Sequence, residues 1–240
     1  YLELSGYIGI SIAESKLYLN TTDGTNYVCV SDGCLADDMD VVVNADLFAK
    51  LINKINTDTV DMEVVGNSLV ITGNGKYTLE LIPNEAGEPL VFPDKFPAQT
   101  EKIGDLSADA LVSINSAIKA SLGNDVGSVY TSYYFGDVIA STDRKMASIF
   151  NLKVFDKPYL LNREFVDLMV MSGTDIVLST SDDMLVAETA VGGSVISVCT
   201  KIPSDVTDFN IDGINSFAAI EVKSFCRIYK VEILDLLDRL

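Results

Sequence analysis

Short apolar or alternating segments, separated by turn dipeptides, make up most of the chain, and this pattern is typical of antiparallel strands. The segment 60–82 predicts three antiparallel strands joined by two tight hairpins, because a glycine-containing turn separates each apolar run from the next. The segment 175–202 predicts a second meander of the same kind. The turn dipeptides of the two meanders are Gly66-Asn67, Asn74-Gly75, Asp182-Asp183 and Gly192-Gly193.

Helical stripes, with apolar residues three or four positions apart, appear in only a few places. One stripe consists of Leu47, Phe48, Leu51, Ile52 and Ile55, and another of Leu111, Ile114, Ile118 and Leu122. Two further helices are expected, from Asn162 to Met171 and from about Val231 onward. Asn44, Ser107 and Asn162 are predicted N-caps, because their side chains can accept a hydrogen bond from a first-turn N–H.

Four segments recur in one order at a nearly constant spacing. Residues 44–52 match 162–170 at an offset of 118, 59–71 match 175–187 at 116, and 21–28 and 81–83 match 141–148 and 201–203 at 120. Such agreement indicates two copies of one α+β unit of roughly 115–120 residues.

The two copies do not contain the same set of predicted elements. The predicted helix at 107–122 has no counterpart in the first copy, and residues 225–240 resemble 101–117. We therefore expect part of a longer protein with three units. The predicted domains are residues 1–103, lacking the N-terminal helix, residues 104–218, and residues 219–240 as the beginning of a third domain.

Composition narrows the possible chemistry. The 240 residues include 17 Lys and Arg against 35 Asp and Glu, a formal net charge of −18, and no histidine. Without histidine, Ser-His-Asp and Cys-His catalysis and histidine-ligated zinc or haem are excluded. The four cysteines lack the spacing of a zinc site, so we expect free thiols in a reducing cytoplasm, no metal and no cofactor. No apolar run approaches the ~18 residues of a membrane span.

Three longer segments carry a resemblance to a known family. Residues 47–83, residues 159–203, and residues 138–152, in which Thr142-Asp143 precedes a basic residue, a methionine and an alanine, resemble the bacterial DNA sliding clamps. These clamps are the DNA polymerase III β subunit family. Residues 231–240 resemble the first helix of that family's third domain.

The resemblance implies an α+β fold, a tandem repeat of DNA-clamp domains, each with two helices packed on antiparallel sheet. It implies a chain of three domains that closes head to tail as a homodimeric ring around duplex DNA. Such a ring is not an enzyme but a cytoplasmic processivity factor in DNA replication. The implied partners are duplex DNA, bound without sequence specificity, the DNA polymerase, the clamp loader and other clamp-binding peptides, with no membrane.

The helices carry candidate contacts to DNA. The residues that would face phosphates in a clamp are Lys50, Lys54, Asn115, Lys119 and Arg163. On the helices predicted here, the first four lie opposite the apolar stripes, and Arg163 begins the third helix. The alternative is that each is an ordinary solvated helix position.

A second candidate site follows from the resemblance, in which partner proteins insert a hydrophobic-aromatic peptide between the second and third domains. By position this pocket would use Tyr130, Thr142, Arg144, Lys145, Met146, Pro203 and Val206. Met and Tyr offer an adaptable apolar surface, and a nearby cation can meet a peptide carboxylate. The alternative for Met146 and Tyr130 is simple strand packing.

The residues alone leave two other classes of protein possible. A carboxylate-based enzyme such as a glycosidase needs two facing acids, and the repeat and the lack of a sharp motif argue against it. A β-rich duplicated interaction or scaffold protein with no DNA role is the other, and the acidic charge permits it.

Overall fold

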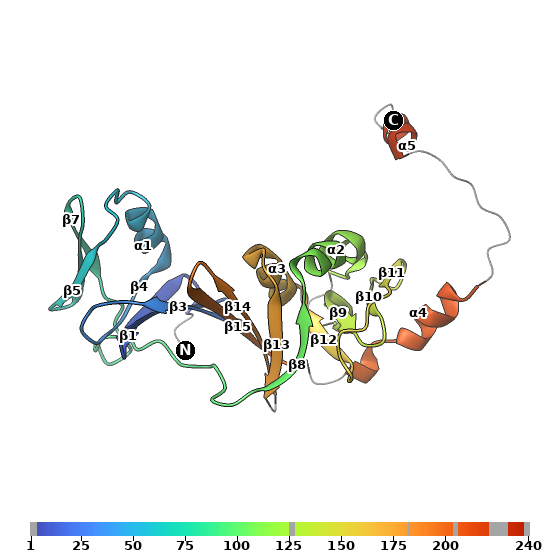
Figure 1. Cartoon of the computed structure of the whole chain (residues 1–240), viewed down its shortest axis with the longest axis horizontal. Coiled ribbons are helices and arrows are strands. Elements are labelled where there is room, and N and C mark those ends of the chain that lie inside the picture. The colour runs from blue at the N-terminus through green and yellow to red at the C-terminus, as the bar shows by residue number, and fades with distance from the viewer. Residues whose placement is uncertain (1–3, 125–127, 182, 204–205, 221–229, 238–240) are drawn as a thin grey trace. The chain divides into compact units, whose positions relative to one another are not determined.

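The protein is described by a computed structural model that covers residues 4–124, 128–181, 183–203, 206–220 and 230–237. Two compact units are present, one ending at Phe209 and the other beginning at Asn210. Every described strand lies in the first unit, where helices and antiparallel sheets follow one another in two successive copies of one pattern (Figure 1). The expected α+β class is confirmed.

The first copy consists of four strands, a helix and a three-stranded meander. In chain order these are β1 (Tyr7–Ala13), β2 (Lys16–Thr22), β3 (Asn26–Gly33), β4 (Met39–Asn44), α1 (Ala45–Ile52), β5 (Asp61–Val65), β6 (Ser68–Thr72) and β7 (Lys76–Glu80). The connection to the second copy crosses β1, because Phe92 is buried over Gly9, where an added Cβ would lie 2.5 Å from Phe92 Cβ.

The second copy opens with a strand and a helix that have no counterpart among the described residues of the first. These are β8 (Glu101–Leu106) and α2 (Ala108–Ile118), followed by the 3₁₀ turns η1 (Lys119–Ser121) and η2 (Val129–Thr131). The remaining elements are β9 (Ser132–Phe135), β10 (Ile139–Thr142), β11 (Ala147–Phe150), β12 (Tyr159–Asn162), α3 (Arg163–Ser172), β13 (Ile176–Ser181), β14 (Met184–Val191), β15 (Ser194–Lys201) and η3 (Val206–Asp208).

Pairing registers confirm both predicted meanders and the repeat that relates them. The five residue pairs of β5·β6 recur 116 residues later as the five pairs of β13·β14. The turns after β5 and β14 contain Gly66 and Gly192, with φ of 60° and 61°, a backbone region that favours glycine in two-residue hairpins. The turn chemistry of the sequence therefore determines the register of each meander.

One continuous antiparallel sheet joins the two copies. Its strand order is β4-β1-β2-β3-β15-β14-β13-β8, and β3 and β15 form six residue pairs between Asn26↔Thr200 and Ser31↔Val195. Asn162 reinforces this junction, because its Nδ2 donates to Asn26 Oδ1 at 3.3 Å and to Thr200 Oγ1 at 2.9 Å. Asn26 and Thr200 are buried, so these bonds are shielded from water.

The three predicted N-caps are confirmed. Asn44, Ser107 and Asn162 each accept a hydrogen bond from the backbone N–H three residues later, at 3.0, 3.2 and 2.7 Å. An acidic residue stands in the first turn of each helix, where it complements the helix dipole. Local side-chain chemistry thus determines where these helices begin.

Each copy has its own hydrophobic core. In the second copy, α2 and α3 pack beside each other, and Leu111, Ile114 and Ile118 of α2 share one buried cluster with Phe165 of α3. In the first copy, Phe48 of α1 covers a smaller cluster that contains β1, β4, β6 and β7. The domain limits at residues 103 and 218 stay predictions.

Leu47 is a correction to the expected first stripe. Its side chain is 54% exposed, whereas its counterpart at an offset of 118, Phe165, is fully buried. The reason is that α2 packs against α3 in the second copy and no described helix packs against α1 in the same way.

The second unit contains two short helices, α4 (Ile211–Ala218) and α5 (Lys230–Leu237). Helix α5 confirms the helix expected from about Val231, and α4 was not predicted. Gly213 in its first turn is a poor helix former, but Asn210 caps the helix by accepting from Gly213 N at 3.0 Å. None of the helices within the described ranges has the length and apolarity to cross a membrane.

Candidate functional site

Helix α1 carries the first two cations of the predicted DNA-facing set. Lys50 lies in its last turn and is exposed. Lys54 is also exposed but follows the end of the helix, in a turn where its N–H donates to Leu51 O at 2.9 Å. Both ammonium groups are therefore open to solvent.

The two predicted DNA-facing cations of the second copy lie beside one carboxylate, that of Asp167. Lys119 Nζ lies 2.6 Å from Asp167 Oδ1, and Arg163 Nε lies 4.0 Å from Asp167 Oδ2. Each of the three side chains is about a third exposed, at 32%, 40% and 34% for Lys119, Arg163 and Asp167. Asp167 thus joins the end of α2 to the beginning of α3 and offsets part of the positive charge.

Asn115 is less exposed to solvent than its predicted contact with DNA phosphates suggests. The residue is half-buried, and its Oδ1 is shielded from solvent without a hydrogen-bond partner among the described residues. Its amide therefore lies at the edge of the α2 packing surface.

The second candidate site is built on the turn between β10 and β11. Thr142 Oγ1 donates to Met146 O at 2.6 Å and accepts from Arg144 N at 3.0 Å. Asp143 Oδ1 accepts from Lys145 N at 2.8 Å and from Met146 N at 2.6 Å. These backbone hydrogen bonds lower the pKa of Asp143, because they favour the ionised carboxylate.

The same turn occurs in the first copy, 120 residues earlier. Thr22 and Asp23 make the corresponding hydrogen bonds across residues 22–26, at 2.7 to 2.9 Å. The left-handed position is Gly24 with φ 92° in the first copy and Arg144 with φ 72° in the second. An arginine held in this conformation is strained, and such strain is concentrated at functional sites.

Aromatic rings gather beside this turn. The Arg144 guanidinium carbon lies 4.7 Å from the centre of the Tyr130 ring, a cation–π contact. Phe209 packs against Tyr130 at 5.8 Å between ring centres and stacks on Tyr134 at 5.3 Å. Phe209 is buried, and the η3 turn that begins at Val206 brings it there, with Phe209 N donating to Val206 O at 3.2 Å.

The exposed part of this surface is the outer side of the turn. Met146 is 55% exposed, Lys145 is exposed, Thr142 is buried and Pro203 is half-buried. An exposed methionine that follows two cations in the same turn suits an apolar ligand with a negative charge.

The sequence pattern did not single out Phe209, Tyr134 or Asp167. Each acts through a partner far away in the chain, as Asp167 does with Lys119, 48 residues apart. The aromatic residue that follows the Pro203 segment was the only available signal for Phe209.

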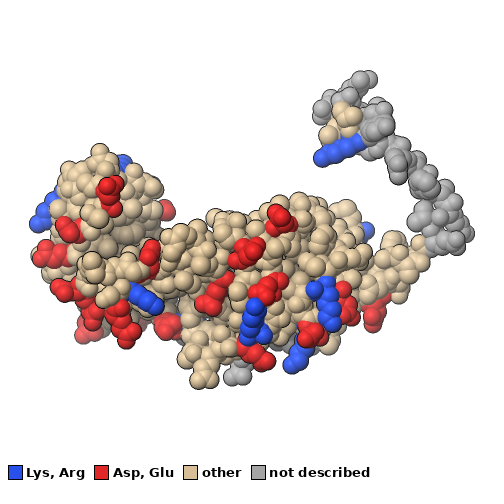
Figure 2. Space-filling model, viewed as in Figure 1, with Lys and Arg blue, Asp and Glu red and all other residues tan. Residues whose placement is uncertain are grey.

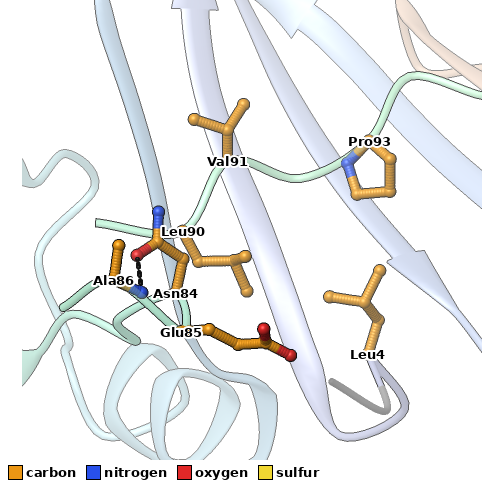
Figure 3. A pocket seen from close by; sticks show the side chains of 7 residues that line it. All are labelled: Leu4, Asn84, Glu85, Ala86, Leu90, Val91 and Pro93. Carbon is orange, nitrogen blue, oxygen red and sulfur yellow. Dashed lines mark hydrogen bonds between the residues drawn. The ribbon is translucent and has the colours of Figure 1, made fainter. Parts of the chain in front are cut away.

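A separate hollow lies beside the connection that follows the first meander, with a volume of about 490 Å³. Figure 3 shows Leu4, Leu90, Val91 and Pro93 around it. Asn84 Oδ1 accepts from Ala86 N at 2.9 Å and so serves the local turn. The wall is mainly apolar, and these residues indicate no chemistry.

Acidic side chains dominate the face drawn in Figure 2, where they crowd the lower margin of the first copy. Lys and Arg are fewer and are interspersed with them over the second copy. A net charge of −18 gives the molecule a surface that repels polyanions outside a few cationic positions.

No protein-family model and no curated protein matches the sequence, whereas solved structures match the fold. The DNA polymerase III subunit beta from Pseudomonas aeruginosa is 12% identical with a TM-score of 0.71, over 89% of this chain and 61% of that one. The DNA polymerase III subunit beta from Borrelia burgdorferi, in complex with a natural product, is 14% identical with a TM-score of 0.70, over 83% and 57%. A DNA polymerase sliding clamp from Pseudomonas aeruginosa, with ligand, is 12% identical with a TM-score of 0.68, over 85% and 59%.

These matches show the fold. The chain has the fold of the DNA polymerase III β subunit, as the sequence resemblance indicated. It spans about three fifths of the length of the structures it matches.

Proposed function

We propose that this chain is part of a DNA sliding clamp, a non-enzymatic ring that encircles duplex DNA and tethers a replicative polymerase. The observation that carries the proposal is the way in which the two copies join. Strand β3 at the edge of one copy pairs with β15 at the edge of the next, and the sheet continues across the junction.

The remaining free edges fit the same kind of junction. In the repeat, β11 is the counterpart of β3, and β7 is the counterpart of β15. Both lie at the end of their sheets in the described structure. A third copy would therefore pair with β11 on one side and, through a neighbouring chain, with β7 on the other. Contacts that repeat head to tail in this way close into a ring when the rotation permits.

Within such a ring, we propose that Lys50, Lys54, Lys119 and Arg163, with Asn115 beside them, face the DNA. Lys50 and Lys54 are the exposed cations and would contact phosphates directly. Lys119 and Arg163 share Asp167, so their attraction for phosphate is moderated. Contacts of this kind hold DNA loosely and without reading its sequence, which suits a sliding protein.

We further propose that the turn of residues 142–146, with Tyr130, Pro203 and Val206, forms half of a pocket for partner peptides. A peptide with leucine and phenylalanine near its C-terminus could cover Met146, and its carboxylate could approach Arg144 or Lys145. The polymerase and the clamp loader would compete for this surface.

Primer extension on a circular template tests the proposal. The full-length protein, with its polymerase and loader, should lengthen the products made in one binding event. The double variant Lys50→Glu/Lys54→Glu should shorten them, and the loss should grow with salt. Lys153→Glu/Lys157→Glu, the same two charge reversals in the exposed connection between β11 and β12, is the matched control. If the full-length protein gives no stimulation, the clamp function is wrong and a scaffold role without DNA is favoured.

A further inference from the structure

Arg144 occupies a backbone position that holds glycine in the first copy. The turns at residues 22–26 and 142–146 make the same hydrogen bonds, and their left-handed residues are Gly24 with φ 92° and Arg144 with φ 72°. Outside the Glu14-Ser15 hairpin turn, Arg144 is the only non-glycine residue of the described chain with a positive φ. Glycine suits this conformation better, because a Cβ approaches the carbonyl oxygen there. The turn itself therefore does not require arginine.

The side chain of Arg144 is held in one place by an aromatic ring. Its guanidinium carbon lies over Tyr130, 4.7 Å from the ring centre, and Tyr130 packs against the buried Phe209. A stacked guanidinium keeps its planar set of N–H donors at the edge of the ring and loses less side-chain freedom when it binds a carboxylate. Because Arg144 is exposed, these donors can reach a ligand.

Arg144 has no counter-ion within the part of the chain that the structure describes. Four other cations lie within 4.0 Å of a carboxylate oxygen, namely Lys102, Lys119, Lys153 and Arg163. No described carboxylate lies that close to the Arg144 guanidinium. In a chain with 35 Asp and Glu, an exposed arginine that none of the described acids neutralises keeps its attraction for an external anion.

Lys145, the next residue, is less available to a ligand. The pKa of Asp143 is lowered by backbone hydrogen bonds from Met146 and Lys145 and, to a smaller extent, by the charge of Lys145. The Lys145 ammonium therefore already has a carboxylate in its neighbourhood, whereas Arg144 does not. Of the two cations in the turn, Arg144 is the stronger attractor for the negative group of a ligand.

The surroundings of Arg144 suit one negative charge beside an apolar group. Met146, in the same turn, is 55% exposed and is followed by the exposed Ala147, so an apolar side chain can cover them. Asp143 of the turn and the exposed Asp208 of η3 are acidic, and the net charge of −18 repels nucleic acid and peptides with several acids. The free carboxylate at the end of an apolar peptide supplies a single charge and fits this surface.

We infer that Arg144 is a specificity-determining residue of the peptide site and selects partners whose chain ends in an apolar or aromatic residue with a free C-terminal carboxylate. The guanidinium, held over Tyr130, donates to this carboxylate while the last side chains of the partner cover Met146. The inference rests on the proposed peptide site and adds the chemical group that the site recognises. It accounts for an arginine where the first copy has glycine.

Two peptides that differ only at the C-terminus test this inference with the full-length protein. Both end in leucine and phenylalanine and carry a fluorophore at the N-terminus, but one has a free carboxylate and the other a C-terminal amide. Fluorescence polarisation should show about tenfold tighter binding of the free acid, because the amide lacks the charged acceptor for Arg144.

Arg144→Gly should bind the two peptides alike, with about the affinity that the unaltered protein has for the amide. Its Tm should be unchanged or higher, since glycine suits a φ of 72°. A loss of binding therefore cannot be attributed to unfolding of the turn. Lys157→Ala, which removes one positive charge from an exposed position between β11 and β12, is the matched control and should keep the tenfold preference.

Each contrary result has a distinct meaning. Equal binding of acid and amide by the unaltered protein would overturn the inference and leave the peptide site in place. A preference that persists in Arg144→Gly would assign the carboxylate to another cation, and a preference lost equally in Lys157→Ala would show an effect of net charge. A labelled DNA duplex whose affinity falls in Arg144→Gly would assign Arg144 to phosphates. Failure of both peptides to bind would refute the proposed site and the inference together.

Discussion

Asp167 is expected to weaken the contact of Lys119 and Arg163 with DNA, because it partly neutralises both cations. The substitution Asp167→Asn tests this expectation. The variant keeps the shape of the side chain and removes its charge. Lys119 Nζ, 2.6 Å away, and Arg163 Nε, 4.0 Å away, would then lose their shared counter-ion. If both face the DNA, two cations become available to phosphates.

The magnitudes follow from the exposure of the three side chains. Ion pairs that are about a third exposed contribute about 0.2–1 kcal/mol, so the variant should fold normally. Each additional neutralised phosphate steepens the dependence of log K on log salt by about 0.9. Two freed cations should therefore steepen the slope by about 1.8. That change corresponds to roughly tenfold more affinity lost between 50 and 200 mM salt.

The assay is fluorescence anisotropy of a short labelled duplex with the full-length protein over a salt series. Asp109→Asn is the matched control, since it makes the same charge change in the first turn of α2, away from these cations. A slope that stays unchanged in Asp167→Asn would refute the placement of Lys119 and Arg163 at the DNA. A slope that steepens equally in both variants would show an effect of net charge alone.

Three further predictions concern the second copy. In full-length protein, Met146→Asp should abolish the binding of a peptide with leucine and phenylalanine near its C-terminus, measured by fluorescence polarisation. Met171→Asp is the control and should bind the peptide normally. Normal binding by Met146→Asp would show that the peptide does not bind at the turn of residues 142–146. Phe209→Ala should lower the free energy of unfolding by about 3–5 kcal/mol in urea, because it empties a buried aromatic stack; a loss near zero would contradict the packing. The pKa of Asp143 lies below its ordinary 3.8, so its stabilisation is present above that pH and is lost as pH falls through the lowered pKa. Asp143→Asn should therefore lose less Tm than the natural chain between about pH 5 and pH 2, and equal losses would contradict the turn hydrogen bonds.

Features that depend on residues close together in the chain could be predicted from the sequence. Asn44, Ser107 and Asn162 cap helices because each partner N–H is three residues away. The meanders were predictable because turns such as Gly66-Asn67 require a backbone that few residues adopt. The repeat then extended these local observations to the fold.

Features that depend on distant partners could not be predicted in this way. The Asp167 pair with Lys119 and the position of Phe209 over Tyr130 arise only after α2, α3 and η3 have packed. The exposure of Leu47 could not be predicted either, because its apolar character matched a buried stripe, while no described helix packs against α1 as α2 packs against α3. The DNA and peptide roles of the named residues stay predictions.

The Asn162 amide has a mechanical consequence for the junction of the two copies. Its oxygen caps α3, while its nitrogen holds Asn26 of one copy and Thr200 of the other. A bending motion at β3·β15 would have to break six ladder pairs, expose a buried polar bridge and release the start of a helix together. The β3·β15 junction should therefore resist bending, and the ring proposed above would have to open at other contacts.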